Sequence, residues 1–306
     1  MKKNNYRYLG YGVCMSALYP LLLLGIMAIS TAPIFIKLCP APALIIAAYR
    51  MLFASLMIAP LAIHRRAWSP WSRREMGWLI LSGVSLSLHF TFFIGSLKYT
   101  SVASSVVLAN TNPLFVGLGG WLFLRERLQT NMVLGILFSV AGGSLIGVGD
   151  MGLSREALFG DGLALLGAIM ASIYFLAGRK MRKHQDLLSY IFPVYSIAGL
   201  VLVLFSVIAQ QPFFIYSTST YLYLFLLALI PQLIGHSTFN WALKYLPASM
   251  VAITVLGETI GSTLLAYFIL GEGLTTLKVI GGGLIFVGIL VALRPQGTPR
   301  EGEKGS

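Results

Sequence analysis

Two stretches of the chain, Phe93-Ile-Gly-Ser-Leu-Lys-Tyr99 and Phe239-Asn-Trp-Ala-Leu-Lys-Tyr245, agree at Phe, Leu, Lys and Tyr when the sequence is displaced on itself by 146 residues. At the same displacement, and without a gap, residues 124–130 (LRERLQT) fall on residues 270–276 (LGEGLTT). A chance match between apolar segments would share mainly leucine and valine, whereas here lysine, tyrosine and glutamate also agree. The sequence therefore predicts an internal duplication. Two glycines, Gly135 and Gly142, also fall on Gly281 and Gly288.

The composition is that of an integral membrane protein. Of the 306 residues, 57% are hydrophobic and 10% charged, and the mean hydropathy is +0.82. So few polar groups cannot cover the surface of a water-soluble globule. Ten spans of about 20 residues would use about 200 residues. The remainder suffices for short loops and leaves no room in this sequence for a soluble catalytic domain.

Charged residues divide the sequence into uncharged intervals of the length that crosses a bilayer. Glu75 and Lys98 enclose one such interval. The interval between Asp186 and Lys244 is too long for one helix, and its polar centre at 210–220 divides it into two. The pattern predicts ten membrane helices in all. Four of the expected segments are 41–63, 161–178, 248–270 and 275–293.

The matched helices are the third to fifth against the eighth to tenth, so the two copies are displaced by five spans. Because five is odd, the second copy must cross the membrane in the opposite sense. The expected fold is therefore an all-α integral membrane protein made of two inverted five-helix repeats, residues 1–150 and 151–294. Residues 295–306 are expected to form a disordered cytoplasmic tail. Such a repeat can alternate access to a site near the membrane midplane, or it can simply make a stable bundle.

The distribution of Lys and Arg predicts the orientation. With the N-terminus in the cytoplasm, 17 of these residues lie on the inner side and 4 on the outer side. Positive charge concentrates on the cytoplasmic side of membrane proteins, so both termini are expected to be cytoplasmic and the protein is expected in the inner (plasma) membrane. The formal net charge of +12 is thereby explained by topology, and we expect no nucleic-acid partner.

Glu258 stands in the middle of the apolar segment 248–270. A charge there costs on the order of 3 kcal/mol on insertion scales, so the carboxyl should face the bundle interior and be paired or protonated. Thr254 and Ser262 lie four residues to either side, on the same helical face. Asn112, preceded by Asn110, occupies the equivalent position in the first half. We consider two roles for Glu258: proton coupling or binding of a substrate amine, and a purely structural role.

The equivalent third and eighth helices each carry a histidine. Gln232, His236 and Asn240 recur every four residues and form one stripe, and His89 precedes Phe93 by one turn. A single histidine in a membrane helix is more often a packing residue than a proton carrier. Two of them on equivalent helices make a role in a substrate or proton site as plausible as packing.

Three further side chains are candidates for the interior. Tyr174 and Trp241 could form aromatic walls for a ligand, although aromatic residues near span ends usually belong to interfacial belts. Arg50 lies within its span, where it could snorkel or form an internal ion pair. We interpret Arg50 as structural, in an ion pair with Glu258.

Short pairs and triplets recurring in both halves give the chain a family resemblance. They are Tyr49-Arg50, Leu97-Lys98-Tyr99 with Ser104 and Ser105, Asn112-Pro113, Leu124-Arg125-Glu126, Leu243-Lys244-Tyr245, Gly257-Glu258 and Leu270-Gly271-Glu272. With these residues the chain resembles the ten-helix drug/metabolite transporter superfamily, in its EamA-type branch, over residues 15 to 294. The resemblance implies transport of small organic molecules, often amino acids or related metabolites and often by export. Thr259 departs from the pattern, because the family usually has proline there, and so we expect a weaker helix break.

The sequence thus predicts a secondary transporter of small metabolites, proton-coupled or passive, and not an enzyme. No Walker A or zinc-protease motif occurs, and the four histidines are too dispersed for a metal site, so neither a cofactor nor a metal is expected. The expected partners are a small-molecule substrate and the lipid bilayer, and a homodimer is left open. The rival class is an integral enzyme acting on lipid, which should cluster His, Asp or Ser near one interface.

Overall fold

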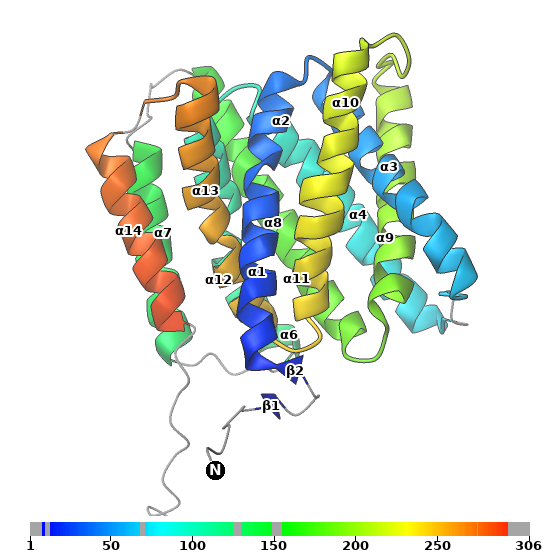
Figure 1. Cartoon of the computed structure of the whole chain (residues 1–306), viewed down its shortest axis with the longest axis horizontal. Helices are drawn as coiled ribbons and strands as arrows, with labels where there is room; N and C mark the ends of the chain where they lie inside the picture. Colours follow the sequence, from blue (N-terminus) through cyan, green and yellow to red (C-terminus); the bar gives the residue numbers. More distant parts are fainter. Residues whose placement is uncertain are drawn as a thin grey trace, which may run out of the picture.

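The computed structural model describes residues 8–9, 13–67, 71–124, 130–148, 155–273 and 275–292, and the residues so described form a bundle of helices (Figure 1). The α-helices are α1 (Met15–Ser30), α2 (Ala32–Leu38), α3 (Ala43–His64), α4 (Arg73–Ser96), α5 (Val102–Ala109), α6 (Asn112–Leu124), α7 (Thr130–Val148), α8 (Arg155–Arg182), α9 (Leu187–Ile208), α10 (Thr218–Leu227), α11 (Ser237–Ala242), α12 (Ala248–Val255), α13 (Gly257–Leu265) and α14 (Thr276–Ala292). Two segments are π-helical, η1 (Ala228–His236) and η2 (Ala266–Leu270). A short antiparallel pair, β1 (Tyr8–Leu9) and β2 (Val13–Cys14), precedes α1.

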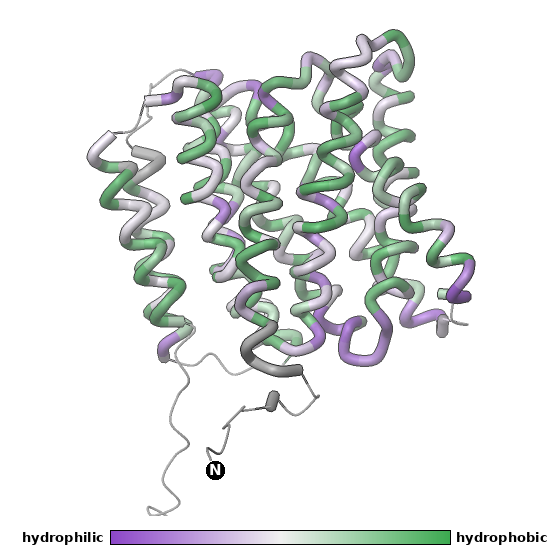
Figure 2. The backbone as a smooth tube through the Cα atoms, viewed as in Figure 1, coloured by the Kyte–Doolittle hydropathy of each residue, from purple (hydrophilic) through white to green (hydrophobic). Residues whose placement is uncertain are grey.

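Eight helical segments of the described chain are long and apolar enough to cross a membrane. They are Leu18–Leu38, Ala43–His64, Arg73–Ser96, Val102–Leu124, Arg155–Arg182, Leu187–Ile208, Thr218–Ala242 and Ala248–Leu270. The remaining two expected spans coincide with α7 and α14, whose described apolar stretches are shorter, Thr130–Leu145 and Val279–Ala292. Figure 2 shows hydrophobic residues along the helices and hydrophilic ones concentrated near the two ends of the bundle. The prediction of an all-α integral membrane protein is confirmed at this level.

The helix boundaries recur at the displacement found in the sequence. Adding 146 to the bounds of α5, Val102–Ala109, gives those of α12, Ala248–Val255, and the same step takes the first residue of α7 to that of α14. In each half, the helix of one long span is also interrupted near the centre of that span. The interruption falls between α5 and α6 in the first half and between α12 and α13 in the second.

The π-helix η1 absorbs a one-residue difference between the halves. The serine N-caps of α4 and α10, Ser72 and Ser217, are 145 residues apart, whereas the last residues of α4 and α11, Ser96 and Ala242, are 146 apart. The span of the first half has 24 residues and that of the second has 25. A π-helical turn holds more residues than an α-helical turn, so an extra residue fits without moving the two ends of the span.

The glycines of α7 and α14 bring these two helices into close contact, and the helices lie side by side in Figure 1. A Cβ atom on Gly135 would come within 2.7 Å of the Gly288 carbonyl oxygen, and one on Gly142 would meet the Gly281 carbonyl oxygen. Each glycine thus contacts the repeat equivalent of the other. This reciprocal pattern is that of two segments related by a twofold axis. The earlier glycine of α7, Gly135, meets the later glycine of α14, Gly288, and Gly142 meets Gly281. The two helices therefore run antiparallel.

Gly142→Ala should lower the stability of the protein by about 1–3 kcal/mol, because overpacking against atoms that cannot move is costly. The new Cβ would lie 2.9 Å from the backbone nitrogen of Ile285 and 2.8 Å from the Leu284 Cβ. Gly283→Ala is the matched control, since a Cβ there meets nothing within 4 Å. Thermal unfolding of the detergent-purified variants measures the effect. Equal unfolding midpoints for the two variants would contradict the packing described.

Candidate functional site

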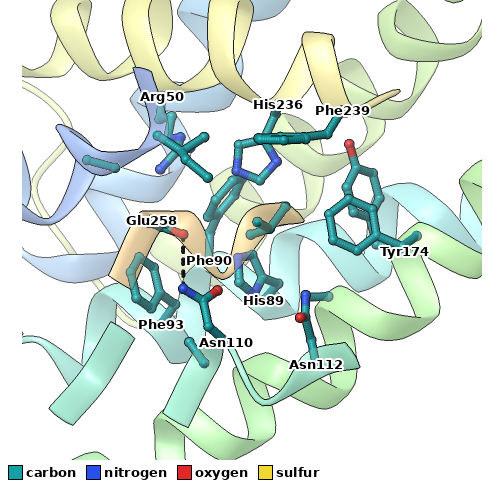
Figure 3. Close-up of a pocket in the computed structure, with 16 residues that line it drawn as sticks. Arg50, His89, Phe90, Phe93, Asn110, Asn112, Tyr174, His236, Phe239 and Glu258 are labelled. Carbon is teal, nitrogen blue, oxygen red and sulfur yellow. Dashed lines mark hydrogen bonds between the residues drawn. The ribbon is translucent and has the colours of Figure 1, made fainter. Parts of the chain in front are cut away.

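A cavity lies between the interrupted spans, with side chains from both halves around it (Figure 3). Its volume is about 40 Å³, measured as the space open to the centres of water molecules, which is room for roughly three waters. Glu258 and Asn112 stand near the middle of the spans Ala248–Leu270 and Val102–Leu124. The cavity is therefore at mid-depth of the apolar part of the bundle, and in this conformation it is small.

The two helix interruptions meet at the cavity. Asn110, between α5 and α6, donates from Nδ2 to a carboxylate oxygen of Glu258 at 3.4 Å and to the Thr259 hydroxyl oxygen at 3.2 Å. Proline at 259 would offer no hydroxyl to this amide. The interruption between α12 and α13 consists of Leu256 alone, whereas Asn110 and Thr111 both separate α5 from α6. A break is therefore present without proline, and it is the shorter of the two.

Arg50 of α3 is buried, with only 1% of its surface exposed. Its Nε donates to the Gln232 amide oxygen at 2.9 Å, and its guanidinium carbon lies 4.1 Å from the ring centre of Phe90. Its Nη1 makes no hydrogen bond. Arg50 and Glu258 both line the cavity, yet the structure describes no ion pair between them. The interpretation of Arg50 as Glu258's ion-pair partner therefore does not hold in this conformation; an amide and an aromatic ring are its neighbours instead.

The two histidines lie together, as the repeat suggested. The ring centres of His89 and His236 are 6.5 Å apart, and Phe93 stacks on His89 at 5.7 Å. His89 Nδ1 lies 2.9 Å from the carbonyl oxygen of Gly167. Because a carbonyl only accepts, Nδ1 of His89 carries the proton and Nε2 is the acceptor in the neutral ring. His236 Nδ1 has no hydrogen-bond partner. Among the described residues, no group of three His, Cys, Asp or Glu could hold a metal ion.

Asn240 lies outside the cavity, in a hydrogen-bonded layer beside it. Its Nδ2 donates to the hydroxyls of Tyr174 at 2.6 Å and Tyr195 at 3.3 Å, and the Tyr195 and Ser237 hydroxyls are 3.2 Å apart. Tyr174 lines the cavity. Ser237 borders a wide depression of about 760 Å³, whose rim includes Arg65. The layer therefore separates the cavity from a depression on the side predicted to be cytoplasmic.

The structure brings eight of the twelve candidate residues to the cavity and keeps four away from it. Those that line it are Arg50, His89, Phe93, Asn110, Asn112, Tyr174, His236 and Glu258. Trp241 packs against Tyr245 in a tilted arrangement, with ring centres 5.0 Å apart. Thr254 and Ser262 bond the carbonyls of Met250 and Thr259 within their own helices. These three, like Asn240, are not cavity-lining residues.

Sequence reasoning missed three of the aromatic walls, Phe90, Phe175 and Phe239. Phe90 lies beside His89 in sequence and below Arg50 in space, and no polar signal marked it. Gln232 was recognised in the stripe with His236, but its contact with Arg50, 182 residues away along the chain, could not be read from a pattern.

Comparisons with known proteins agree with this architecture. The model of the EamA-like transporter family matches residues 17–148 and 158–294. An uncharacterized transporter of Archaeoglobus fulgidus is 27% identical over 82% of this chain and 88% of its own length. An uncharacterized transporter of Bacillus subtilis, YetK, is 23% identical over 99% and 93%. The mouse solute carrier family 35 member G1 is 29% identical over 56% of this chain and 49% of its own length.

A solved crystal structure superposes with a TM-score of 0.73 over 91% of this chain and 96% of the other, at 21% identity, and so shares the fold. The family model covers the chain as two consecutive matches, one in each half. The chain belongs to the EamA-like transporter family, and it is a multi-pass membrane transporter.

Proposed function

We propose that this protein is a secondary transporter that moves a small polar or amphipathic metabolite by alternating access. The observation that carries the proposal is the polar cavity at mid-depth, where the two interrupted spans meet through Asn110 and Glu258. Breaks in membrane helices are tolerated where they line a cavity, and in transporters such breaks form the substrate site. A lipid-modifying enzyme would instead concentrate its polar groups near one interface.

The mechanical part of the proposal is an inverted repeat of ten spans. It is supported by the helix bounds that recur after 146 residues and by the reciprocal glycine contacts of α7 and α14. In a repeat of this kind, exchanging the conformations of the two halves converts the outward-facing state of a transporter into the inward-facing state. The described conformation has a small central cavity, so a substrate can enter only after the bundle opens.

On the inner side, the proposed route runs from the wide depression to the cavity. The hydrogen-bonded layer of Ser237, Tyr195, Asn240 and Tyr174 lies between them. Opening towards the cytoplasm would therefore require this layer to separate. Its members exchange hydroxyl and amide hydrogen bonds, each worth about 1 kcal/mol net, so they can part without a large cost.

The substrate class follows from the lining together with the family resemblance. The cavity combines charged and amide groups with aromatic walls such as Phe93 and Tyr174. Such a lining suits a small amphipathic solute, and we propose an amino acid or a related metabolite. Export is the direction that the resemblance implies. We propose that the protein lies in the inner (plasma) membrane with both termini in the cytoplasm, because the distribution of Lys and Arg predicts this orientation.

Glu258 is the proposed proton-coupling group. It has 9% of its surface exposed and shares the cavity with all four other titratable side chains that line it, Arg50, His89, Tyr174 and His236. A carboxyl in this position can bind a proton in one facing state and release it in the other, provided that its contacts change between them. Its hydrogen bond to Asn110 bridges the two halves, so relative movement of the halves changes those contacts.

The orientation can be tested with single cysteines in the full chain, after Cys14 and Cys39 are replaced by serine. We expect Ser219→Cys, at the exposed start of α10, to react with a membrane-impermeant maleimide in intact cells. Lys183→Cys, at the exposed end of α8, should react only after the cells are broken. The reverse pattern of labelling would show that the proposed orientation is wrong.

The coupling role can be tested by release of substrate from proteoliposomes loaded with a radiolabelled mixture of the protein amino acids. In the wild type, an acidic exterior should accelerate release, because inward proton movement drives export. Glu258→Gln should abolish this acceleration, since an amide side chain cannot bind and release the proton. The rate of release with and without the pH gradient is the measurement.

Asp161→Asn is the matched control for the coupling experiment. Asp161 is a carboxylate of the α8 span that does not line the cavity, so this variant should keep the response to the gradient. Unchanged rate and gradient dependence in Glu258→Gln would eliminate the coupling role. If the wild type releases label equally fast with and without the gradient, the protein is a passive facilitator.

A further inference from the structure

One wall of the cavity is formed by Arg50 and His236, and Gln232 holds Arg50 from outside the lining. Gln232 and Arg50 are both buried, with 0% and 1% of their surfaces exposed. The Gln232 amide oxygen accepts from Arg50 Nε at 2.9 Å. Neither the Gln232 amide nitrogen nor Arg50 Nη1 has a hydrogen-bond partner. The two unpaired donors thus belong to two buried residues that are joined by one hydrogen bond.

Unpaired donors of this kind are expensive in a membrane interior. Leaving a buried polar group unsatisfied costs about 1–3 kcal/mol, and more for a charged group. The Phe90 ring occupies one face of the guanidinium, and a ring face does not replace a hydrogen bond to an in-plane N–H. His236, which packs edge-on against Phe90 with ring centres 5.4 Å apart, also has an unpaired Nδ1. The arrangement is satisfied when an acceptor enters.

The opposite wall has the complementary character. Asn112 has an unpaired amide oxygen, Oδ1, and the Glu258 carboxylate accepts, from the part of the chain that the structure describes, the long bond from Asn110. Figure 3 shows Arg50 and His236 on one side of the cavity, with Asn110 and Asn112 on the other. The cavity is therefore polarised, with cationic and donor groups on the α3 and η1 side and acceptors on the α6 and α13 side.

We propose that Arg50, held by Gln232, is the carboxylate-binding group of the substrate cavity. A guanidinium whose Nε is already fixed presents its remaining N–H groups in a rigid plane, the geometry that matches a carboxylate. The assignment rests on the proposed transport function for its physiological meaning, and it adds that the transported solute carries a carboxylate. A substrate amine, where present, faces Glu258 and Asn112 on the other wall.

The π-helix places Gln232 against Arg50, and it places His236 in the cavity wall. Both residues belong to η1, where the span of the second half holds one residue more than its counterpart. The regular helix α4 supplies His89 and Phe90 from the equivalent span. The first half supplies Arg50 of α3 to the donor wall, and the second half supplies the η1 residues, which the repeat does not duplicate.

The test uses two sets of matched probes that differ only in their charged groups. One set is L-leucine, L-leucinamide and isocaproate, and the smaller set is glycine, glycinamide and acetate. Their binding to detergent-purified full-length protein is measured from the rise of the unfolding midpoint with ligand concentration. We expect the wild type to be stabilised by members that carry a carboxylate, more than by the amide of the same set.

Two substitutions separate binding from folding. Gln232→Glu is nearly isosteric, keeps an acceptor for Arg50 Nε and replaces the unpaired donor with a carboxylate that neutralises the guanidinium. It should fold and should weaken carboxylate binding by about ten- to hundredfold. Arg50→Gln should weaken it similarly. Arg182→Gln is the control, because Arg182 is equally buried at 2% but bonds the Asn240 backbone oxygen away from the cavity; it should change stability and not the probe preference.

Each outcome decides for or against the carboxylate site. Loss of carboxylate binding in Gln232→Glu, with binding in Arg182→Gln unchanged, supports it. The assignment is overturned if no carboxylate probe stabilises the wild type, if Gln232→Glu binds the carboxylates as well as the wild type does, or if chloride stabilises the wild type in their place. Transport is measured separately in the proteoliposomes, so carboxylate binding without release would discard the transport function and keep the binding site.

Discussion

The structure depends on satisfying polar groups at a depth where lipid offers no partner. Each half interrupts a membrane span near its middle, and an interruption exposes backbone and side-chain groups that cost several kcal/mol if they are left in hydrocarbon. The protein places the two interruptions against each other, so that Asn110 of one bonds Glu258 and Thr259 of the other. The break that each half needs is therefore stabilised by the opposite half. The same contact also locates the cavity, because the groups left without partners around it face one another and not the acyl chains.

Close packing between α7 and α14, beside the break regions, gives the two halves a fixed relation. The glycine contacts between α7 and α14 join backbone to backbone, and such contacts depend on small residues because membrane helices gain little from apolar burial against apolar lipid. A larger residue at Gly142 would separate the helices and shift the break regions, because Leu256 at one break packs in the same cluster as Ile136 and Ile285 of this helix pair. The packing of one helix pair and the geometry of the cavity are thus linked through the repeat, even though no side chain of the glycine contact lines the cavity.

Most of the fold could be predicted from the sequence, since it is set by local rules. The expected segment 248–270 matches the helical span Ala248–Leu270, because charge and proline bound it. Eight cavity residues were found because polar groups at span centres have few structural alternatives. The neighbours of Arg50, however, were not predicted, because Gln232 and Phe90 reach it from different spans. A sequence pattern gives the face and the membrane depth of a residue, but not the rotation of one helix against another. The π-helix was missed for a related reason: a one-residue excess is visible only when both ends of two equivalent spans are known.

At each end of the bundle, a cationic side chain braces two spans of one half. At one end, Lys37 of α2 donates to the Thr100 carbonyl, just beyond the end of α4, at 3.0 Å. At the other end, Arg179 of α8 donates to the Leu243 carbonyl, just beyond the end of α11, at 2.6 Å. A cation at the C-terminal end of a helix is favourable, because the last carbonyls lack intrahelical partners. The spans that end with α4 and α11 are equivalent in the two halves. At each end of the bundle, a hydrogen bond therefore joins the first span of one half to the third span of the same half. Neither contact joins one half to the other, so each half keeps its own brace if the two halves move against each other.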